Sequence, residues 1–469
     1  MQRWIDFTQP SGRPQPTQVI EGTPFAVDRR VSFTLRLNSA ITREDHSCKA
    51  STQIPNGAPT PVPIFHQQDQ QFSSAFSLLR EAIAQRVFPA ASIAVTQAGR
   101  LLALKSFGKF VYDEDLEGAS PLSRDLRQRG DFDFEVQPST LFDLASLTKP
   151  IATTTMAMIL YERGLVELEA PVSGTIPELL TGDARRHEIT FRMLLAHSSG
   201  LPAYEKLFLR THSRDQLLEE AFLTPLAADP GTRAEYSDIG FIILGIALER
   251  VAGESLDAFC RREIFGPLGM PSTTFNPAAG LRPGIPPTAN ERQEQHGAGT
   301  CALQVEESTQ VQPGAIQPKP RSTFRNRIIQ GEVQDENAFV LGGVAGHAGL
   351  FSTAEDLARF AHLMLSGGSP ILRPETIAVF TRREAMPAGT SRALGWDTPS
   401  APSQSGRHFR PRSYGHLGYT GTSLWIDPDW QLSITLLTNR TWPDCSNQAI
   451  RQARPKIHDA IVEALHDPL

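Results

Sequence analysis

The pattern Ser146-Leu147-Thr148-Lys149 constrains this chain more than any other stretch, because it sets two reactive groups on one surface of a helix. Side chains three residues apart lie above one another on a helix, so the Ser146 hydroxyl and the Lys149 amine can touch. A serine hydroxyl becomes a nucleophile when a neighbouring group takes its proton, and a desolvated lysine can do so. The pattern therefore predicts an activated serine.

The residues around Ser146 predict that it lies at a helix start. A largely apolar run from Ile151 to Tyr161 is closed by Gly164, and Pro150 falls in the first turn, where a missing N–H costs little. Unpaired N–H groups and the positive end of the helix dipole gather there, which suits a developing oxyanion. A serine that only caps a buried helix is the plainer alternative for this segment taken alone.

A second copy of the pattern, Ser106-Phe107-Gly108-Lys109, has a different context. It lies in a strand-like run that turns at Gly108, with no helix behind it. A chain of this length should hold about one or two such matches by chance. We expect no chemistry from this copy.

Two later segments add polar groups on loops. Tyr236-Ser237-Asp238 precedes the apolar run from Ile239 to Leu248, so Tyr236 lies at a helix entrance, where a phenol can carry protons and Asp238 can cap the helix. Residues 414–422 read as a glycine-rich strand, followed by a turn and by a further strand at 432–438. Glycine in a strand often marks close approach by a ligand or backbone, although a simple glycine-rich bend is the alternative.

In this order the three segments resemble the serine β-lactamase and penicillin-binding-protein superfamily. Its motifs are Ser-x-x-Lys, then Tyr-x-Asn/Ser, then Lys-Thr-Gly or a variant with His. Tyr236 lies 90 residues after Ser146 (236 − 146) and His416 lies 180 after Tyr236 (416 − 236), a spacing similar to the class C and esterase branch. The stretches 189–202 and 342–353 also look like that branch, and the resemblance covers roughly residues 68–465.

The resemblance implies a role for each matching residue. Ser146 would be the acyl-accepting nucleophile, Lys149 would take or redirect its proton, and Tyr236 would shuttle protons to the leaving group and activate the deacylating water. Which of the lysine and the tyrosine is the base stays open. The backbone N–H groups of Ser146 and Tyr419 would form the oxyanion hole, where each donor is worth roughly 3 to 4 kcal/mol at the transition state.

The positions implied to bind substrate are Asp238, His416 and Gly418, and two of them depart from the family pattern. Asp238 stands where many lactamases have Asn, so it cannot donate an amide hydrogen bond and adds a negative charge near Lys149. His416 stands in place of Lys and is expected to carry a partial charge at neutral pH. A substrate carboxylate would therefore be held less firmly than in an efficient lactamase.

These observations predict a serine hydrolase that works through an acyl-enzyme on Ser146, with carboxylesterase activity and a small ester, amide or peptide as substrate. A D-Ala-D-Ala-type peptidase or weak β-lactamase is the alternative within enzymes. A penicillin-binding-like sensor or scaffold without turnover is the alternative outside them. No cofactor or metal is predicted: His197 and His347 match no zinc spacing and are interpreted as hydrogen-bonding loop residues.

Charge and composition limit the kinds of partner that this chain is expected to bind. The formal net charge of −6 argues against nucleic acid, and no run of 18 apolar residues predicts a membrane span. Arg29-Arg30 before an apolar stretch resembles an export signal faintly, but Arg36 interrupts that stretch, so the sequence favours no compartment. It indicates no oligomeric state either.

The predicted fold is of the α/β (α+β) class, an antiparallel sheet flanked by helices plus a mainly helical lobe, like β-lactamases and DD-peptidases. Residues 1–66 are expected to be a disordered arm and 67–465 the hydrolase domain, with the helical lobe at 150–385 and an insertion at 293–322. Helices are predicted at 72–84 and 446–465, a hairpin at 91–96 and 101–107, and two strands within 425–438.

Overall fold

The computed structural model describes residues 60–116, 135–292 and 323–466. They belong to one compact unit, Pro55–Leu469. The predicted insertion at 293–322 and residues 1–59 of the predicted arm lie outside the described residues. The proposed domain boundaries therefore stay predictions. The structure describes only residues 60–66 of the predicted arm.

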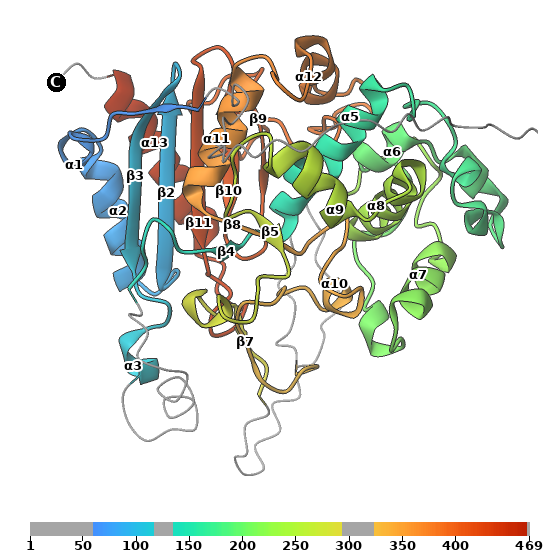
Figure 1. Cartoon of the computed structure of the whole chain (residues 1–469), viewed down its shortest axis with the longest axis horizontal. Helices are drawn as coiled ribbons and strands as arrows, with labels where there is room; N and C mark the ends of the chain where they lie inside the picture. The colour runs from blue at the N-terminus through green and yellow to red at the C-terminus, as the bar shows by residue number, and fades with distance from the viewer. Residues whose placement is uncertain (1–59, 117–134, 293–322, 467–469) are drawn as a thin grey trace, which may run out of the picture. The chain divides into compact units, whose positions relative to one another are not determined.

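The main sheet brings the two ends of this unit together (Figure 1). Among the described residues its strand order is β1-β3-β2-β11-β10-β9, and every neighbouring pair is antiparallel except β1 and β3. The strands are β1 Val62–Pro63, β2 Ala90–Gln97, β3 Arg100–Gly108, β9 Tyr414–Leu417, β10 Ser423–Asp427 and β11 Leu432–Thr438. The predicted hairpin and the two predicted C-terminal strands are confirmed.

Strand β1 corrects the expectation that the arm continues to residue 66. Val62 and Pro63 pair in parallel with Arg100 and Leu101 of β3. Proline is tolerated there because β1 is an edge strand, where one side needs no backbone donor. The fold therefore begins a few residues earlier than the composition indicated.

Helices cover both faces of the sheet. Helices α2 (Ser73–Ala84) and α13 (Ile450–His466) share an apolar core with Ile93 and Val95 of β2, whereas α11 (Ala354–Leu365) shares the other core with Ala94. Figure 1 shows α2 and α13 together at one side of the strands and α11 across them. Alternate residues of a strand point to opposite faces, which explains this division. The predicted first and last helices are confirmed.

The rest of the unit is largely helical. Its helices are α5 Thr155–Glu162, α6 Phe191–Leu195, α7 Arg214–Leu223, α8 Asp238–Ala252, α9 Leu256–Cys260, α10 Glu336–Val340 and α12 Pro374–Thr381. Two four-residue helices, α1 Gln68–Gln71 and α3 Asp113–Leu116, are close in sequence to strands of the main sheet. Short strands accompany them: β4 Phe142–Asp143, β5 Thr274–Phe275, β8 Leu350–Ser352, and the pair β6 Ala289–Asn290 and β7 Ile328–Ile329. The lobe predicted at 150–385 thus also contains small sheets.

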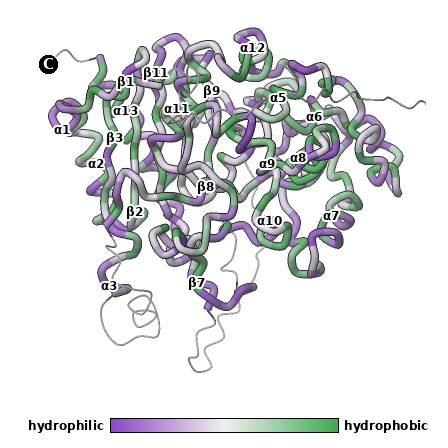
Figure 2. The backbone as a smooth tube through the Cα atoms, viewed as in Figure 1, coloured by the Kyte–Doolittle hydropathy of each residue, from purple (hydrophilic) through white to green (hydrophobic). Residues whose placement is uncertain are grey.

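Helix α8 lies at the centre of this helical part. Nine of its residues are buried, nearly all of them apolar, and Figure 2 draws most of this helix in the hydrophobic colour. A helix that is apolar all round must be enclosed by other elements. In the described ranges no helix combines the length and hydropathy that a membrane span requires.

Candidate active site

Ser146 lies at the start of a composite helix. Strand β4 ends at Asp143, a 3-10 turn covers Ala145–Leu147, a π-helical turn covers Lys149–Thr154, and α5 continues from Thr155. The helix start is confirmed, but its first turns are not regular α-helix. Pro150 lacks an N–H, and π turns are frequent at functional sites.

Two side chains meet at the Ser146 hydroxyl, as the motifs predicted. Lys149 Nζ lies 3.0 Å from Ser146 Oγ, and the Tyr236 hydroxyl donates to the same oxygen at 2.7 Å. Lys149 is fully buried, whereas Ser146 and Tyr236 are partly exposed. The Ser146 hydroxyl and the Tyr236 side chain are therefore accessible to solvent, whereas the Lys149 amine is not.

Lys149 has two further partners. Its ammonium donates to Asp238 Oδ1 at 2.7 Å and to the backbone oxygen of His347 at 3.0 Å. Burial alone would lower the pKa of Lys149, but the carboxylate of Asp238 and the nearby Tyr236 phenol raise it above its usual value. Three acceptors thus match the three N–H bonds of an ammonium.

Asp238 does not cap helix α8, contrary to the expectation. Ser237 is the N-cap, and its Oγ accepts the Gly240 N–H at 3.0 Å. Asp238 is the first helical residue, and its carboxylate points to Lys149 instead. The predicted negative charge near Lys149 is confirmed.

The Tyr236 ring is surrounded by nitrogen-bearing side chains. Its centroid lies 4.6 Å from the His197 ring and 5.9 Å from the His416 ring, with Lys149 Nζ at 4.8 Å and Arg392 Cζ at 5.3 Å. Burial raises the pKa of Tyr236, although the positive charge of Lys149 opposes that rise. Arg392 was missed in the sequence because it lies in a loop without a motif, and only the fold brings it here.

His416 is uncharged, which corrects the expected partial charge at neutral pH. It lies on β9 and is only 3% exposed, and burial, with Lys149 and Arg392 nearby, lowers its pKa well below 6.5. Its Nδ1–H donates to the Leu417 oxygen at 2.8 Å, so Nε2 is a hydrogen-bond acceptor. Within the described part of the chain that Nε2 has no partner.

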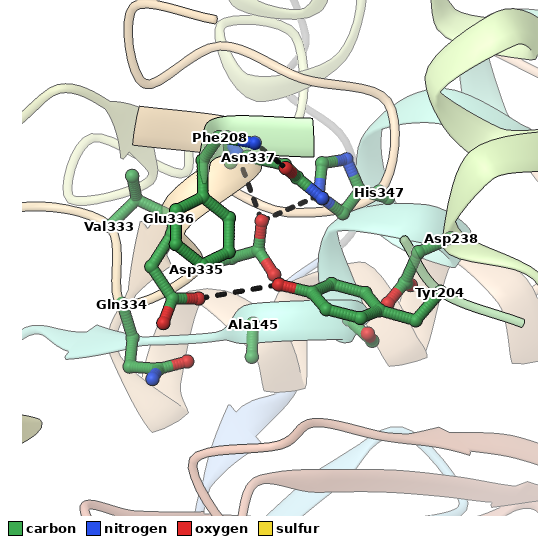
Figure 3. Close-up of polar contacts among 12 residues, drawn as sticks. Ala145, Tyr204, Phe208, Asp238, Val333, Gln334, Asp335, Glu336, Asn337 and His347 are labelled. Atoms are coloured by element: carbon green, nitrogen blue, oxygen red, sulfur yellow. Dashed lines mark hydrogen bonds and ion pairs between the residues drawn. The ribbon is translucent and has the colours of Figure 1, made fainter. Parts of the chain in front are cut away.

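His197 and His347 form hydrogen bonds from loops, as the sequence indicated. His197 Nδ1 accepts the Ser237 N–H at 3.0 Å. Figure 3 shows the His347 ring joined to Asp335, whose Oδ1 accepts the Nε2–H at 2.9 Å. This bond fixes the loop whose carbonyl holds Lys149. In the ranges that the structure covers, no group of three or more His, Cys, Asp or Glu residues could hold a metal ion.

The second Ser-x-x-Lys copy lies in a strand and not at a helix start. Ser106 lies in β3, where its Oγ is 3.2 Å from Ser92 Oγ. Lys109 Nζ instead donates to Asp113 at 2.7 Å on the surface. The predicted strand context of this copy is confirmed, and its lack of chemistry stays a prediction.

The turn 418–422 links β9 to β10 and lies against the residues that precede Ser146. The Thr420 hydroxyl donates to the backbone oxygen of Asp143 at 2.7 Å, and the Thr422 hydroxyl donates to that of Leu144 at 2.9 Å. The fold thus brings the proposed oxyanion residue Tyr419 and the neighbouring Gly418 beside the turn of Ser146.

Comparison with known proteins identifies the family. A family model described as Beta-lactamase matches residues 76–455. The chain belongs to the beta-lactamase family. Proteins that are similar to it include the N-acetylmuramyl-L-alanine amidase of Bacillus subtilis, 32% identical over 75% of this chain and 77% of the relative. A protein of Salmonella paratyphi A named "Putative D-alanyl-D-alanine carboxypeptidase" is 30% identical over 77% of this chain and 81% of the relative.

A solved structure agrees with the family's fold. EstCE1, a hydrolase with promiscuous acyltransferase activity, superposes with a TM-score of 0.63 at 20% identity, over 84% of this chain and 99% of that one. The predicted beta-lactamase-like fold is confirmed, and the chain is a serine hydrolase of the β-lactamase and penicillin-binding-protein type.

Proposed function

We propose that this beta-lactamase-family chain is a carboxylesterase that forms an acyl-enzyme on Ser146. The observation that carries the proposal is the Ser146 hydroxyl held at 3.0 Å by Lys149 and at 2.7 Å by Tyr236. In the reactive form Tyr236 is a phenolate beside the Lys149 ammonium, and it takes the Ser146 proton as Oγ attacks the ester carbonyl carbon. That proton then leaves with the departing alcohol, and water hydrolyses the acyl-enzyme.

Two substrate-side residues support a neutral ester. Asp238 cannot donate a hydrogen bond to an acyl amide, and its carboxylate is paired with Lys149 at 2.7 Å. His416 is neutral and offers an acceptor, so it gives a substrate carboxylate no charge to bind. Neither residue requires the amide side chain or the anionic group of a penicillin.

Arg392 favours a second candidate, a peptidase or amidase acting on a substrate with a free carboxylate. Its guanidinium lies beside Tyr236, and its side chain is 13% exposed and 3.6 Å from Asp397. A guanidinium can bind a carboxylate through two parallel hydrogen bonds. The names of the Bacillus subtilis and Salmonella relatives support this candidate too.

Arg392→Gln separates the two candidates. As an esterase, the variant should hydrolyse p-nitrophenyl butyrate with kcat/KM within about threefold of the wild type, because no charge on that substrate meets Arg392. A peptide ending in D-Ala-D-Ala should be cleaved by the wild type at least about 100-fold less efficiently than the ester. The proposed esterase function would be replaced by a peptidase function if the wild type cleaves the peptide faster than this. Arg392→Gln should then reduce peptide cleavage tenfold or more, and amidation of the peptide's C-terminus should remove it.

Asp238→Asn is expected to move the pH profile of ester hydrolysis. The Asp238 carboxylate raises the pKa of Lys149, so its loss lowers that pKa. If the ammonium is the working form, as its three acceptors indicate, the fall of kcat/KM at alkaline pH should begin at a lower pH in the variant. Activity near pH 7 should decline about tenfold, since general acid–base groups contribute 10²- to 10⁴-fold.

The control is Asp113→Asn, which removes the surface carboxylate that pairs with Lys109 at 2.7 Å and should leave the profile unchanged. The opposite result would be that Asp238→Asn gains activity at neutral pH and that the acidic side of its pH–activity profile moves to lower pH. In that case Lys149 works as a free amine base.

A further inference from the structure

The two proposed oxyanion donors come from segments far apart in the chain. Ser146 and Tyr419 are separated by 273 residues (419 − 146). A donor is useful only when it lies about 2.7 to 3.1 Å from the oxyanion. The spacing of the two backbone N–H groups must therefore be fixed by contacts between the segments.

Two buried threonines supply such contacts. The Thr420 hydroxyl donates to the Asp143 backbone oxygen at 2.7 Å, and the Thr422 hydroxyl donates to the Leu144 backbone oxygen at 2.9 Å. Both threonines have no exposed surface. A hydrogen bond between fully buried groups is costly to break, because the abandoned carbonyl meets no water.

The turn and the Ser146 segment also touch directly. A Cβ atom on Gly418 would lie 1.9 Å from Thr422 Oγ1 and 2.4 Å from the Leu144 oxygen. Glycine is therefore needed for this close approach, which explains the sequence signal seen in the glycine-rich strand. Any movement of Leu144 must also move the turn.

The Asp143 side chain fixes the other side of the same segment. It is 2% exposed, and its Oδ1 accepts the Ala145 N–H at 2.8 Å while its Oδ2 accepts the Gln334 N–H at 2.7 Å. Ala145 has φ of 47°, a left-handed conformation that non-glycine residues adopt at a cost of about 1 to 3 kcal/mol. The carboxylate thus holds a strained residue immediately before Ser146.

We propose that Asp143 and Thr420 are positioning residues that set the distance between the backbone N–H groups of Ser146 and Tyr419. Asp143 acts through its carboxylate on Ala145 and through its carbonyl on Thr420, so one residue joins both halves of the oxyanion hole. The inference rests on the proposed acyl-enzyme on Ser146. Both residues are buried, so they act through the backbone that they hold.

A matched pair of variants tests this role. Thr420→Val keeps the shape but removes the hydroxyl, whereas Thr420→Ser keeps the hydroxyl. For ester hydrolysis we expect kcat to fall about 10- to 100-fold in Thr420→Val with KM within about twofold, because a donor displaced by about 1 Å costs that much. Thr420→Ser should recover most of kcat. A boronic acid that forms a tetrahedral adduct should lose affinity in Thr420→Val by about the fold-change in kcat/KM.

Thr435→Val is the control, because Thr435 is also fully buried but its hydroxyl has no partner among the described residues. It should leave kcat and boronate affinity unchanged. If Thr420→Val does not fold, Asp143→Asn decides by the same measurements, since its amide cannot accept both N–H groups.

Unchanged kcat in the folded Thr420→Val variant, or equal losses in Thr420→Val and Thr420→Ser, would overturn the inference. A Ser146→Ala variant that keeps full activity would overturn the proposed function instead, so the two failures are distinguishable.

Discussion

Ser146→Ala is expected to abolish ester hydrolysis and labelling by a fluorophosphonate probe. The methyl side chain cannot attack a carbonyl or a phosphorus centre, and no second described serine has both a lysine and a tyrosine on its hydroxyl as Ser146 does. Removing a nucleophile costs on the order of 10⁶-fold in kcat. Hydrolysis of p-nitrophenyl butyrate and peptide mass mapping of the labelled protein measure the two losses.

Ser106→Ala is the matched control, because it changes the other Ser-x-x-Lys copy. Its hydroxyl contacts Ser92 on the neighbouring strand, and the variant should keep both turnover and labelling. Labelling of Ser146→Ala at the wild-type rate would refute the acyl-enzyme mechanism.

Lys149→Ala and Tyr236→Phe should each reduce kcat by about 10³-fold or more, and the double variant should be hardly worse than either single one. Both groups act on one oxygen, Ser146 Oγ, so the loss of one disables the proton transfer that the other serves. Residues that work as a unit lose their effects non-additively.

The measurement is a double-mutant cycle on kcat with a neutral ester, with melting temperatures recorded for all four proteins. Lys149→Ala also leaves the Asp238 carboxylate without its partner at 2.7 Å, so Lys149→Met serves as a second variant that keeps the side-chain volume. Losses that multiply would mean that the lysine and the tyrosine serve separate steps.

Features encoded by local sequence were predictable. The helix at 73–84 and the hairpin of β2 and β3 follow from short-range periodicity and turn residues, and the structure confirms them. The contact between Ser146 and Lys149 follows from helix geometry alone. The convergence with Tyr236 came from the ordered motifs of a known family rather than from any local pattern.

Features set by tertiary packing were not predictable. The charge of His416 depends on burial and on two cations from other segments, Lys149 and Arg392, which no neighbouring residue reveals. Asp238 looked like a helix cap because aspartate favours that position, but Ser237 precedes it and takes the role. The role of Asp143 could not be predicted from the sequence. Its hydrogen-bond partners are the backbone N–H of the strained residue Ala145 and that of Gln334, which lies on a loop 191 positions away.

The position of β11 in the main sheet has a consequence for how the chain is made. It lies between β2 and β10, and it begins 324 residues after β3 ends (432 − 108). At about 5 to 20 residues per second, a ribosome needs roughly 15 to 65 s to cover that interval. During this interval the β2–β3 hairpin has an unpaired edge, and the apolar face that α13 later covers is exposed. The nascent chain should therefore depend on chaperones that hold it. It should become active only once its last strands have left the ribosome.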